Sequence, residues 1–288
     1  MEFLITFVNG LSLGGIYAMI ALGYTMVYGI AKMLNFAHGD IIMVGGYAIL
    51  VFLWINPIVA IIASIIFCVL MGVIVEKVAY KPLRGASPLA VLITAIGVSY
   101  LLQSIAQMIF GSAPKYVNIA DLGTLKMGSL AIGYNTIITL ACSVVVMVAL
   151  NLFVKFSKTG RAMVAVSEDK QAAQLMGINV NNIIMITFAI GSALASLAAL
   201  FFLLKAPRIN PTFGALPGIK AFTAAVIGGI GSIPGAMIGG LLLGVIECFA
   251  QAIPEVAPYT DAIEFSILIV ILLVKPTGLL GKKRREKV

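Results

Sequence analysis

The chain consists of long apolar stretches separated by short polar connections. Most of these stretches have the roughly 17–25 residues that a helix needs to cross the hydrocarbon of a bilayer. Only helices are expected, because backbone groups find no water in hydrocarbon and the stretches are too long for barrel strands. The nine stretches lie at about 5–30, 36–54, 58–75, 88–110, 134–154, 183–204, 212–230, 235–253 and 262–274. The pattern predicts an all-α polytopic membrane helix bundle of about eight to nine segments, built as a single transmembrane domain over residues 1–288.

Two of the stretches carry breaks near their beginning. Segment 36–54 opens with "NFAHGD", and if Asp40 caps its helix only about 14 residues remain, which is short for a full crossing. Segment 212–230 contains a Pro-Gly pair just before Lys220. Such breaks are typical of discontinuous helices whose irregular backbone lines a watery cavity. The alternatives are a proline kink, a connection at the membrane surface, or a re-entrant segment that leaves eight crossings.

The basic residues favour one set of connections. Cytoplasmic loops of membrane proteins carry an excess of Lys and Arg, so the richer side is predicted to be cytoplasmic. The loops at 76–87 and 155–182 and the tail at 275–288 are then inside, and the loop at 111–133 is outside. With nine crossings, the C-terminus is inside and the N-terminus outside. The richer side holds 14 of the 19 basic residues: Lys32, Lys77, Lys81, Arg84, Lys155, Lys158, Arg161, Lys170, Lys275, Lys282, Lys283, Arg284, Arg285 and Lys287.

Composition and charge exclude several classes of protein. Hydrophobic residues make up 61% of the chain and charged residues 10%, whereas about a quarter of a soluble domain is charged. The net charge of +8 is explained by topology and by a basic tail beside anionic lipid, so we expect no nucleic-acid binding. His38 is the sole histidine, and the sequence has no phosphate-binding G-x-x-x-x-G-K-[ST] loop and no plausible catalytic triad. We therefore expect no metal site, no cofactor and no enzymatic activity in this chain.

Few ionisable groups lie inside the apolar segments, and two of them, Lys220 and Glu247, stand out. Intramembrane charge is costly and usually faces a partner or a cavity. The two residues could pair with each other, or Glu247 could be satisfied locally. Two such groups are too few for a proton relay, which argues against a proton-driven carrier. Together with the helix breaks, they give the predicted residues of a translocation path: Asn35, His38, Asp40, Lys220 and Glu247.

Small residues recur at steps of four in two segments. Such faces let helix backbones approach closely. We expect them to pack inside this chain rather than to form an interface between subunits. The residues are Gly231, Gly235, Gly239, Gly240 and Gly244 in one segment and Gly191, Ala195 and Ala199 in the other.

The stretch "SEDKQAAQLMGINVNN" at 167–182 interrupts the apolar pattern. It predicts a helix over 168–176, about 13 Å long, with Ser167 as its N-cap and Gly177 as its stop. Such a short helix cannot span the bilayer, but it could lie in a groove of a partner protein. The alternative is a helix that rests on the membrane surface or on its own bundle. Its apolar side is formed by Ala172, Leu175 and Met176, with the small Ala173 beside them.

Three stretches carry a resemblance to a known family. "QAAQLMG" is similar to the E-A-A-x-x-x-G loop of ABC-transporter permeases, with Gln171 where that family usually has Glu. Together with "LSLGGIYAMIALGYTMVYGIAKMLNFAHGDIIMVGGY" (11–47) and "LPGIKAFTAAVIGGIGSIPGAMIGGLLLG" (216–244), it resembles the permeases of branched-chain amino acid ABC importers, the LivH type. The resemblance covers nearly the whole chain.

The resemblance implies a transport subunit of the cell inner membrane that moves Leu, Ile and Val by alternating access. Its implied partners are a second homologous permease subunit, two cytoplasmic ABC ATPases that bind ATP and Mg²⁺, and an extracytoplasmic substrate-binding protein. Alternatives are a permease for another small solute, such as urea, short amides or a sugar, and a stand-alone secondary carrier or channel. The residues expected to couple this chain to the ATPases are Glu168, Asp169, Gln171, Ala172, Ala173, Met176 and Gly177.

Overall fold

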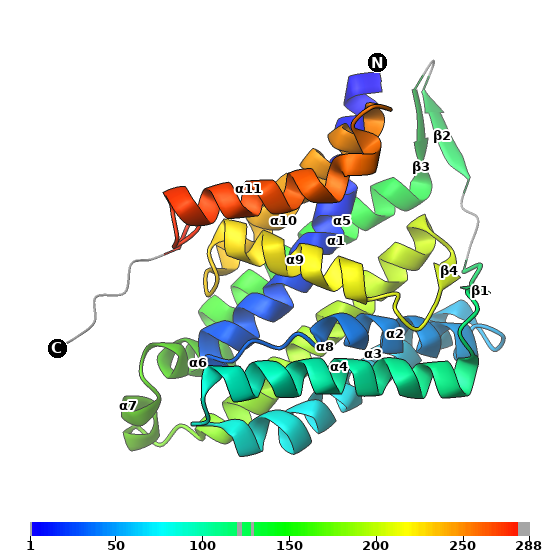
Figure 1. Ribbon diagram of the computed structural model, residues 1–288. Helices are drawn as coiled ribbons and strands as arrows, with labels where there is room; N and C mark the ends of the chain where they lie inside the picture. Colours follow the sequence, from blue (N-terminus) through cyan, green and yellow to red (C-terminus); the bar gives the residue numbers. More distant parts are fainter. Residues whose placement is uncertain (1, 120–122, 128–129, 282–288) are drawn as a thin grey trace.

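The computed structural model describes residues 2–119, 123–127 and 130–281, most of them helical (Figure 1). The helices are α1 (Glu2–Ala31), α2 (His38–Phe52), α3 (Pro57–Val75), α4 (Pro88–Phe110), α5 (Tyr134–Phe156), α6 (Lys158–Glu168), α7 (Lys170–Leu175), α8 (Val180–Lys205), α9 (Ala215–Gly228), α10 (Ile233–Ala252) and α11 (Thr260–Val274). Short helical turns lie at η1 (Glu76–Tyr80), η2 (Lys81–Leu83) and η3 (Ala257–Tyr259). The strands are β1 (Lys115–Tyr116), β2 (Thr124–Met127), β3 (Leu130–Gly133) and β4 (Arg208–Ile209).

The nine predicted apolar segments are confirmed as helices. Within the described ranges, seven helices are long and apolar enough to cross a membrane: α1, α3 with its continuation to Leu83, α4, α5, α8, α10, and α11 together with η3. The remaining two, α2 and α9, are apolar but have only 15 and 14 residues. They are the two segments in which the sequence places breaks. The chain is non-helical over 32–37 before α2 begins at His38. The break predicted at the Pro-Gly pair before Lys220 is wrong, because Pro217, Gly218 and Lys220 lie inside the continuous helix α9, which begins at Ala215. The fold is an all-α, multi-pass bundle.

The two ends of the bundle differ in what they carry (Figure 1). Helix α7, the start of α4 and the final turn of α11 lie at one end. The β2–β3 hairpin, the β1–β4 pair and the start of α1 lie at the other. The described parts of the loops predicted to be cytoplasmic are therefore grouped, and the described parts of loop 111–133 lie opposite them. The strands were not predicted, because each pairs only two to four residues.

Helix α1 forms the centre of the bundle and packs against α10, α8, α5 and α9. Glycines allow this close approach. A Cβ on Gly240 would lie 2.4 Å from the backbone of Ala18 in α1, and one on Gly239 would lie 2.1 Å from the Ala224 oxygen in α9. These distances leave no room for a side chain. The glycine steps in α10 thus serve packing inside the chain, as predicted.

The outer helices keep apolar surface for lipid. In the most apolar 18 residues of α8, 67% are buried, against 22% in α4 and 11% in α11. Apolar side chains on such outer helices gain little by burial, because lipid tails are as apolar as they are. The polar groups considered next lie where the inner helices α1, α2, α9 and α10 meet one another and the inward sides of α4 and α11.

Candidate functional site

The short helices α2 and α9 meet at their N-terminal ends. A Cβ on Gly39, in the first turn of α2, would lie 2.5 Å from the backbone oxygen of Gly214, the residue before α9. A Cβ on Gly214 would in turn lie 1.7 Å from the Gly39 oxygen. Only glycine permits this contact. Since helix N-termini carry partial positive charge, two such ends come together inside the bundle.

Polar side chains at this contact are buried and incompletely bonded. His38 is 2% exposed and lies edge-on to the Tyr24 ring, with ring centroids 4.8 Å apart. Its Nε2 has no hydrogen-bond partner among the described residues. Asn35 accepts a hydrogen bond from the Tyr80 hydroxyl at 2.8 Å, while its Nδ2 has no partner in the described ranges. Buried donors and acceptors are normally satisfied, so these two atoms are exceptions among the buried polar groups of the described residues.

Asp40 does not cap α2, although the helix is as short as that possibility implied. The helix begins at His38, with Ala37 at the N-cap position and no side-chain cap. Backbone bonds to the carbonyl oxygens of Asn35 and Ala37 start the first turn instead. The Asp40 carboxylate, buried in that turn, accepts a hydrogen bond from Gln103 Nε2 of α4 at 2.8 Å. It therefore ties α2 to the outer helix α4.

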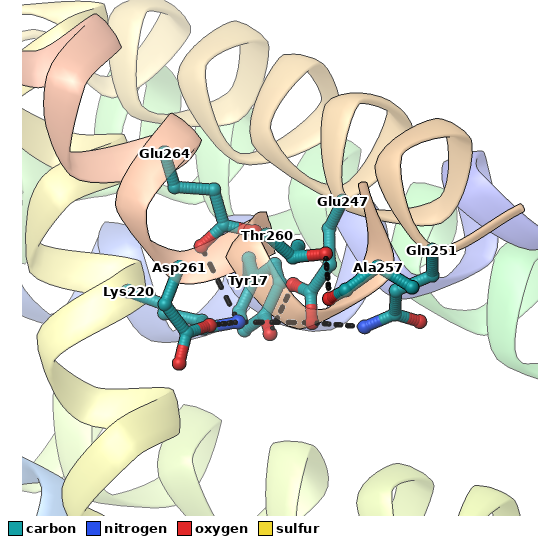
Figure 2. A network of polar contacts seen from close by, with 8 residues as sticks. All are labelled: Tyr17, Lys220, Glu247, Gln251, Ala257, Thr260, Asp261 and Glu264. Atoms are coloured by element: carbon teal, nitrogen blue, oxygen red, sulfur yellow. Dashed lines mark hydrogen bonds and ion pairs between the residues drawn. The ribbon is translucent and has the colours of Figure 1, made fainter. Parts of the chain in front are cut away.

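Lys220 of α9 lies in a network of carboxylates from α10 and α11 (Figure 2). Its Nζ is 3.0 Å from Glu247 Oε1, so the pairing of Lys220 with Glu247 considered from the sequence is present. It is also 2.7 Å from Asp261 Oδ1 and 3.3 Å from Glu264 Oε2. The side chains of Lys220 and Glu247 are each 8% exposed and that of Glu264 is 0% exposed. One cation thus joins three helices.

Glu247 has further partners that the sequence did not indicate. The Tyr17 hydroxyl of α1 donates to its Oε2 at 2.6 Å, and Gln251 Nε2 donates to its Oε1 at 3.1 Å. Glu264, by contrast, has the Lys220 ion pair but no hydrogen bond of normal geometry from any described residue. Sequence reasoning missed Asp261 and Glu264. Their spacing of three at the start of the last apolar segment, which puts both on one helix face, was the available signal.

The predicted helix 168–176 is divided in two, and Ser167 is not its N-cap. Ser167 lies in α6, and its Oγ donates to the Val164 oxygen at 2.7 Å. Asp169 has extended backbone and caps α7, accepting from the amides of Gln171 at 2.8 Å and Ala172 at 3.0 Å. A carboxylate that reaches two amides satisfies more of the helix end than Ser167 could. Gly177 ends the element with φ +82°, as predicted.

The side chains of α7 divide between the bundle and its surroundings. Ala173, expected to face a partner, is 4% exposed and belongs to the core of the chain. Ala172 and Gln171 are exposed, as is Glu168 at the end of α6. Leu175 and Met176 are 89% and 82% exposed. Two large apolar side chains at the polar end of the bundle form a surface that favours contact with another protein.

Comparison with known proteins gives close relatives over the full length. Residues 6–272 match the family described as the permease component of branched-chain amino acid transport systems. The chain is 45% identical to the high-affinity branched-chain amino acid transport system permease protein BraD of Pseudomonas aeruginosa, over 98% of this chain and 96% of that protein. It is 42% identical to the corresponding LivH protein of Salmonella typhimurium, over 100% of this chain and 98% of that protein.

A solved structure extends the likeness to the fold. A metal-chelate type ABC transporter in an inward-facing conformation matches with a TM-score of 0.52 at 13% identity, over 93% of this chain and 85% of that one. At this identity the match shows only that the two chains share a fold. The helix bundle is thus consistent with the permease family to which the full-length relatives belong. The chain belongs to the family of permease components of branched-chain amino acid transport systems.

Proposed function

We propose that the chain is the permease subunit of an ATP-driven ABC importer that moves Leu, Ile and Val across the cell inner membrane. The names of its full-length relatives support this substrate class. The proposed partners are a second homologous permease subunit, two cytoplasmic ATPases and an extracytoplasmic substrate-binding protein. ATP and Mg²⁺ are bound by the ATPases, and this chain needs no cofactor. The end that carries α7 and the last turn of α11 faces the cytoplasm, and the N-terminus faces outward.

The exposed side of α7 is the main structural support for contact with an ATPase. Ala172, Leu175 and Met176 fall on one side of this short helix, at 100° per residue, and all three are exposed. We propose that this side lies in a groove of an ATPase, with Gln171 and Glu168 at its edge. Gly177 and Asp169 set the ends of the helix, and Ala173 anchors it to the bundle. The importer then switches between inward- and outward-open states when the ATPases close.

The coupling role is tested by Ala172→Arg. A bulky charge on the contact side should prevent docking by overpacking and by a buried charge. The matched control is Gln174→Arg, on the opposite side of the same helix. We expect Ala172→Arg to insert normally but to lose the co-purifying ATPases and leucine uptake, with the control close to wild type. Normal ATPase retention and normal uptake in Ala172→Arg would show that α7 is not the coupling element.

The translocation path is proposed to pass the contact between α2 and α9. Support comes from the unsatisfied atoms of His38 and Asn35 and from the two helix N-termini, which favour a substrate carboxylate. Asp40 would position α2 through Gln103 rather than bind substrate. For Lys220 and Glu247, whose groups are already paired, we propose a supporting role beside the path.

The substrate class is tested by competition. Labelled leucine uptake by the complete importer should be reduced by unlabelled isoleucine and valine but not by urea, short amides or ribose. If only a sugar or an amide suppressed uptake, the proposed substrate class would be wrong. The assignment of the chain to an importer would still hold.

A further inference from the structure

The segment that follows α11 folds back onto the end of α9. This segment, residues 275–281, is called the return segment. Its Leu279 amide donates to the Ile227 oxygen at 2.8 Å, and its Leu280 amide donates to the Gly228 oxygen at 2.9 Å. The last carbonyl groups of a helix have no partner within the helix itself. At the end of α9, backbone from far along the chain satisfies two of them.

Two glycines make this contact possible. Gly229 has φ +108° and Gly278 has φ +76°, conformations that a residue with a Cβ rarely adopts. The two also pack directly on each other, since a Cβ on Gly278 would lie 2.5 Å from the Cα of Gly229. A Cβ on Gly229 would lie 2.5 Å from the amide nitrogen of Gly281. The contact between the return segment and the end of α9 therefore leaves no room for a side chain.

The return segment is held in its own shape by internal bonds. The Gly278 amide donates to the Lys275 oxygen at 2.8 Å, and Lys275 Nζ donates to the Leu279 oxygen at 2.7 Å. Gly278 is buried, whereas Leu279 and Leu280 are exposed. The segment continues α11 without a linker, because Lys275 directly follows Val274, the last residue of that helix. Helix α11 and the return segment therefore form one unit.

Helix α11 also holds α9 near the middle of that helix. Asp261 and Glu264, at the start of α11, bind Lys220 of α9 (Figure 2). The start of α9 touches α2, where Gly214 and Gly39 meet through backbone atoms. Helix α9 has 14 residues and is therefore about 21 Å long. It is thus attached to α2 at its start, to α11 near its middle and to the return segment at its end.

We propose that the return segment positions α9 and, through it, the contact between α2 and α9. The hydrogen bonds within a helix make it move as a rigid body, so a displacement at the end of α9 also moves its start. Two backbone hydrogen bonds and a glycine contact fix that end. The positioning of α9 does not depend on which solute is transported. Its effect on transport rests on the proposed function, in which the path passes the α2–α9 contact.

The test compares Gly278→Ala with Gly85→Ala by amide hydrogen exchange of the full chain in detergent. Both variants replace a glycine of positive φ, but a Cβ on Gly85 would meet nothing within 4 Å. In Gly278→Ala, exchange should become about tenfold faster at residues 226–230 and at the first turns of α2 and α9, because the strained contact opens. Gly85→Ala should exchange like wild type at these places. Faster exchange confined to 226–230 and 278–281 would overturn the proposal, because the segment would then be only a local cap.

A second variant leaves every glycine in place. Lys275→Met removes the bond from Nζ to the Leu279 oxygen and should speed exchange at the same places by a smaller factor. If Gly278→Ala does not insert, this variant decides by the same measurement. Wild-type exchange at the first turns of α2 and α9 in every variant that inserts would overturn the proposal.

Transport is measured separately, as leucine uptake by the complete importer, normalised to inserted protein. In Gly278→Ala the maximal rate of uptake should fall while the ATPases are retained, since α7 is unchanged. Faster exchange at the start of α9 combined with normal uptake would support the positioning role. The same result would contradict the proposed path at the α2–α9 contact, so the two proposals can fail independently.

Discussion

Two regions of the bundle hold polar groups inside the membrane, and they differ in whether those groups have partners of opposite charge. In the Lys220 network, one cation meets three carboxylates, and Glu247 accepts from Tyr17, Lys220 and Gln251. At the contact between α2 and α9, His38 Nε2 and Asn35 Nδ2 lack partners among the residues described.

The difference separates structural from functional polar groups. A charge network inside a membrane is stable only when its members are paired, so removing a member is costly. An unsatisfied neutral group costs less and leaves a bonding position open to water or a ligand. We therefore expect substitutions in the network to change stability first, and substitutions at the α2–α9 contact to change transport first. The following predictions run from the largest expected effect on stability to the smallest.

Lys220→Met should be the most destabilising change. It leaves Glu247 and Glu264 buried without a counter-ion, and breaking a buried pair this way costs about 3–5 kcal/mol. The control is Lys205→Met, which removes an exposed lysine at the end of α8. Thermal unfolding in detergent should show a large loss for Lys220→Met and little for the control. If Lys220→Met is as stable as wild type yet transports nothing, Lys220 lines the path instead.

Gly214→Ala should disrupt the contact between α2 and α9. The new Cβ would fall 1.7 Å from the Gly39 oxygen, and overpacking of this kind costs about 1–3 kcal/mol. Gly97→Ala in α4 is the matched control, because its Cβ would meet nothing within 4 Å. Both stability and leucine uptake should fall in Gly214→Ala alone. Equal behaviour of the two variants would show that the helix starts do not need close contact.

Glu247→Gln and Glu264→Gln should differ although they remove the same charge. Glu247 accepts three hydrogen bonds. A hydrogen bond to a charged group contributes about 1.5–3 kcal/mol to stability. Glu264 accepts none of normal geometry from the described residues. Glu247→Gln should therefore lower the unfolding temperature more than Glu264→Gln. The reverse order, measured under identical conditions, would contradict the network as drawn in Figure 2.

His38→Gln should have the smallest effect on stability and a large effect on transport. Glutamine keeps a polar side chain of similar reach, so the unfolding free energy should change by less than about 1.5 kcal/mol. Uptake of leucine should nevertheless fall, because the Nε2 position beside Gly23 is lost. The measurement is uptake normalised to inserted protein. Unchanged uptake would remove His38 from the path.

Much of the fold could be predicted from the sequence, because each apolar segment can be identified from its own residues alone. The nine segments, the shortness of the helix in segment 36–54 and the end formed by Gly177 were correct, whereas the break at the Pro-Gly pair before Lys220 was not. The sequence could not predict which side chain caps α7. Ser167 and Asp169 are both suitable caps, and the extended backbone at Asp169 favours Asp169. The orientation of Ala173 was also missed, since a six-residue helix has too few positions to define a buried side.

The sequence by itself determined that this chain is a membrane bundle, because a bilayer accepts only long apolar helices and sets their length. It also determined the family, through residues spread over the whole chain. Only the tertiary structure decided which polar groups meet. Tyr17 and Glu247 are 230 positions apart, and Gly39 and Gly214 touch through backbone atoms alone. Such contacts depend on the packing of whole helices, which no local pattern encodes.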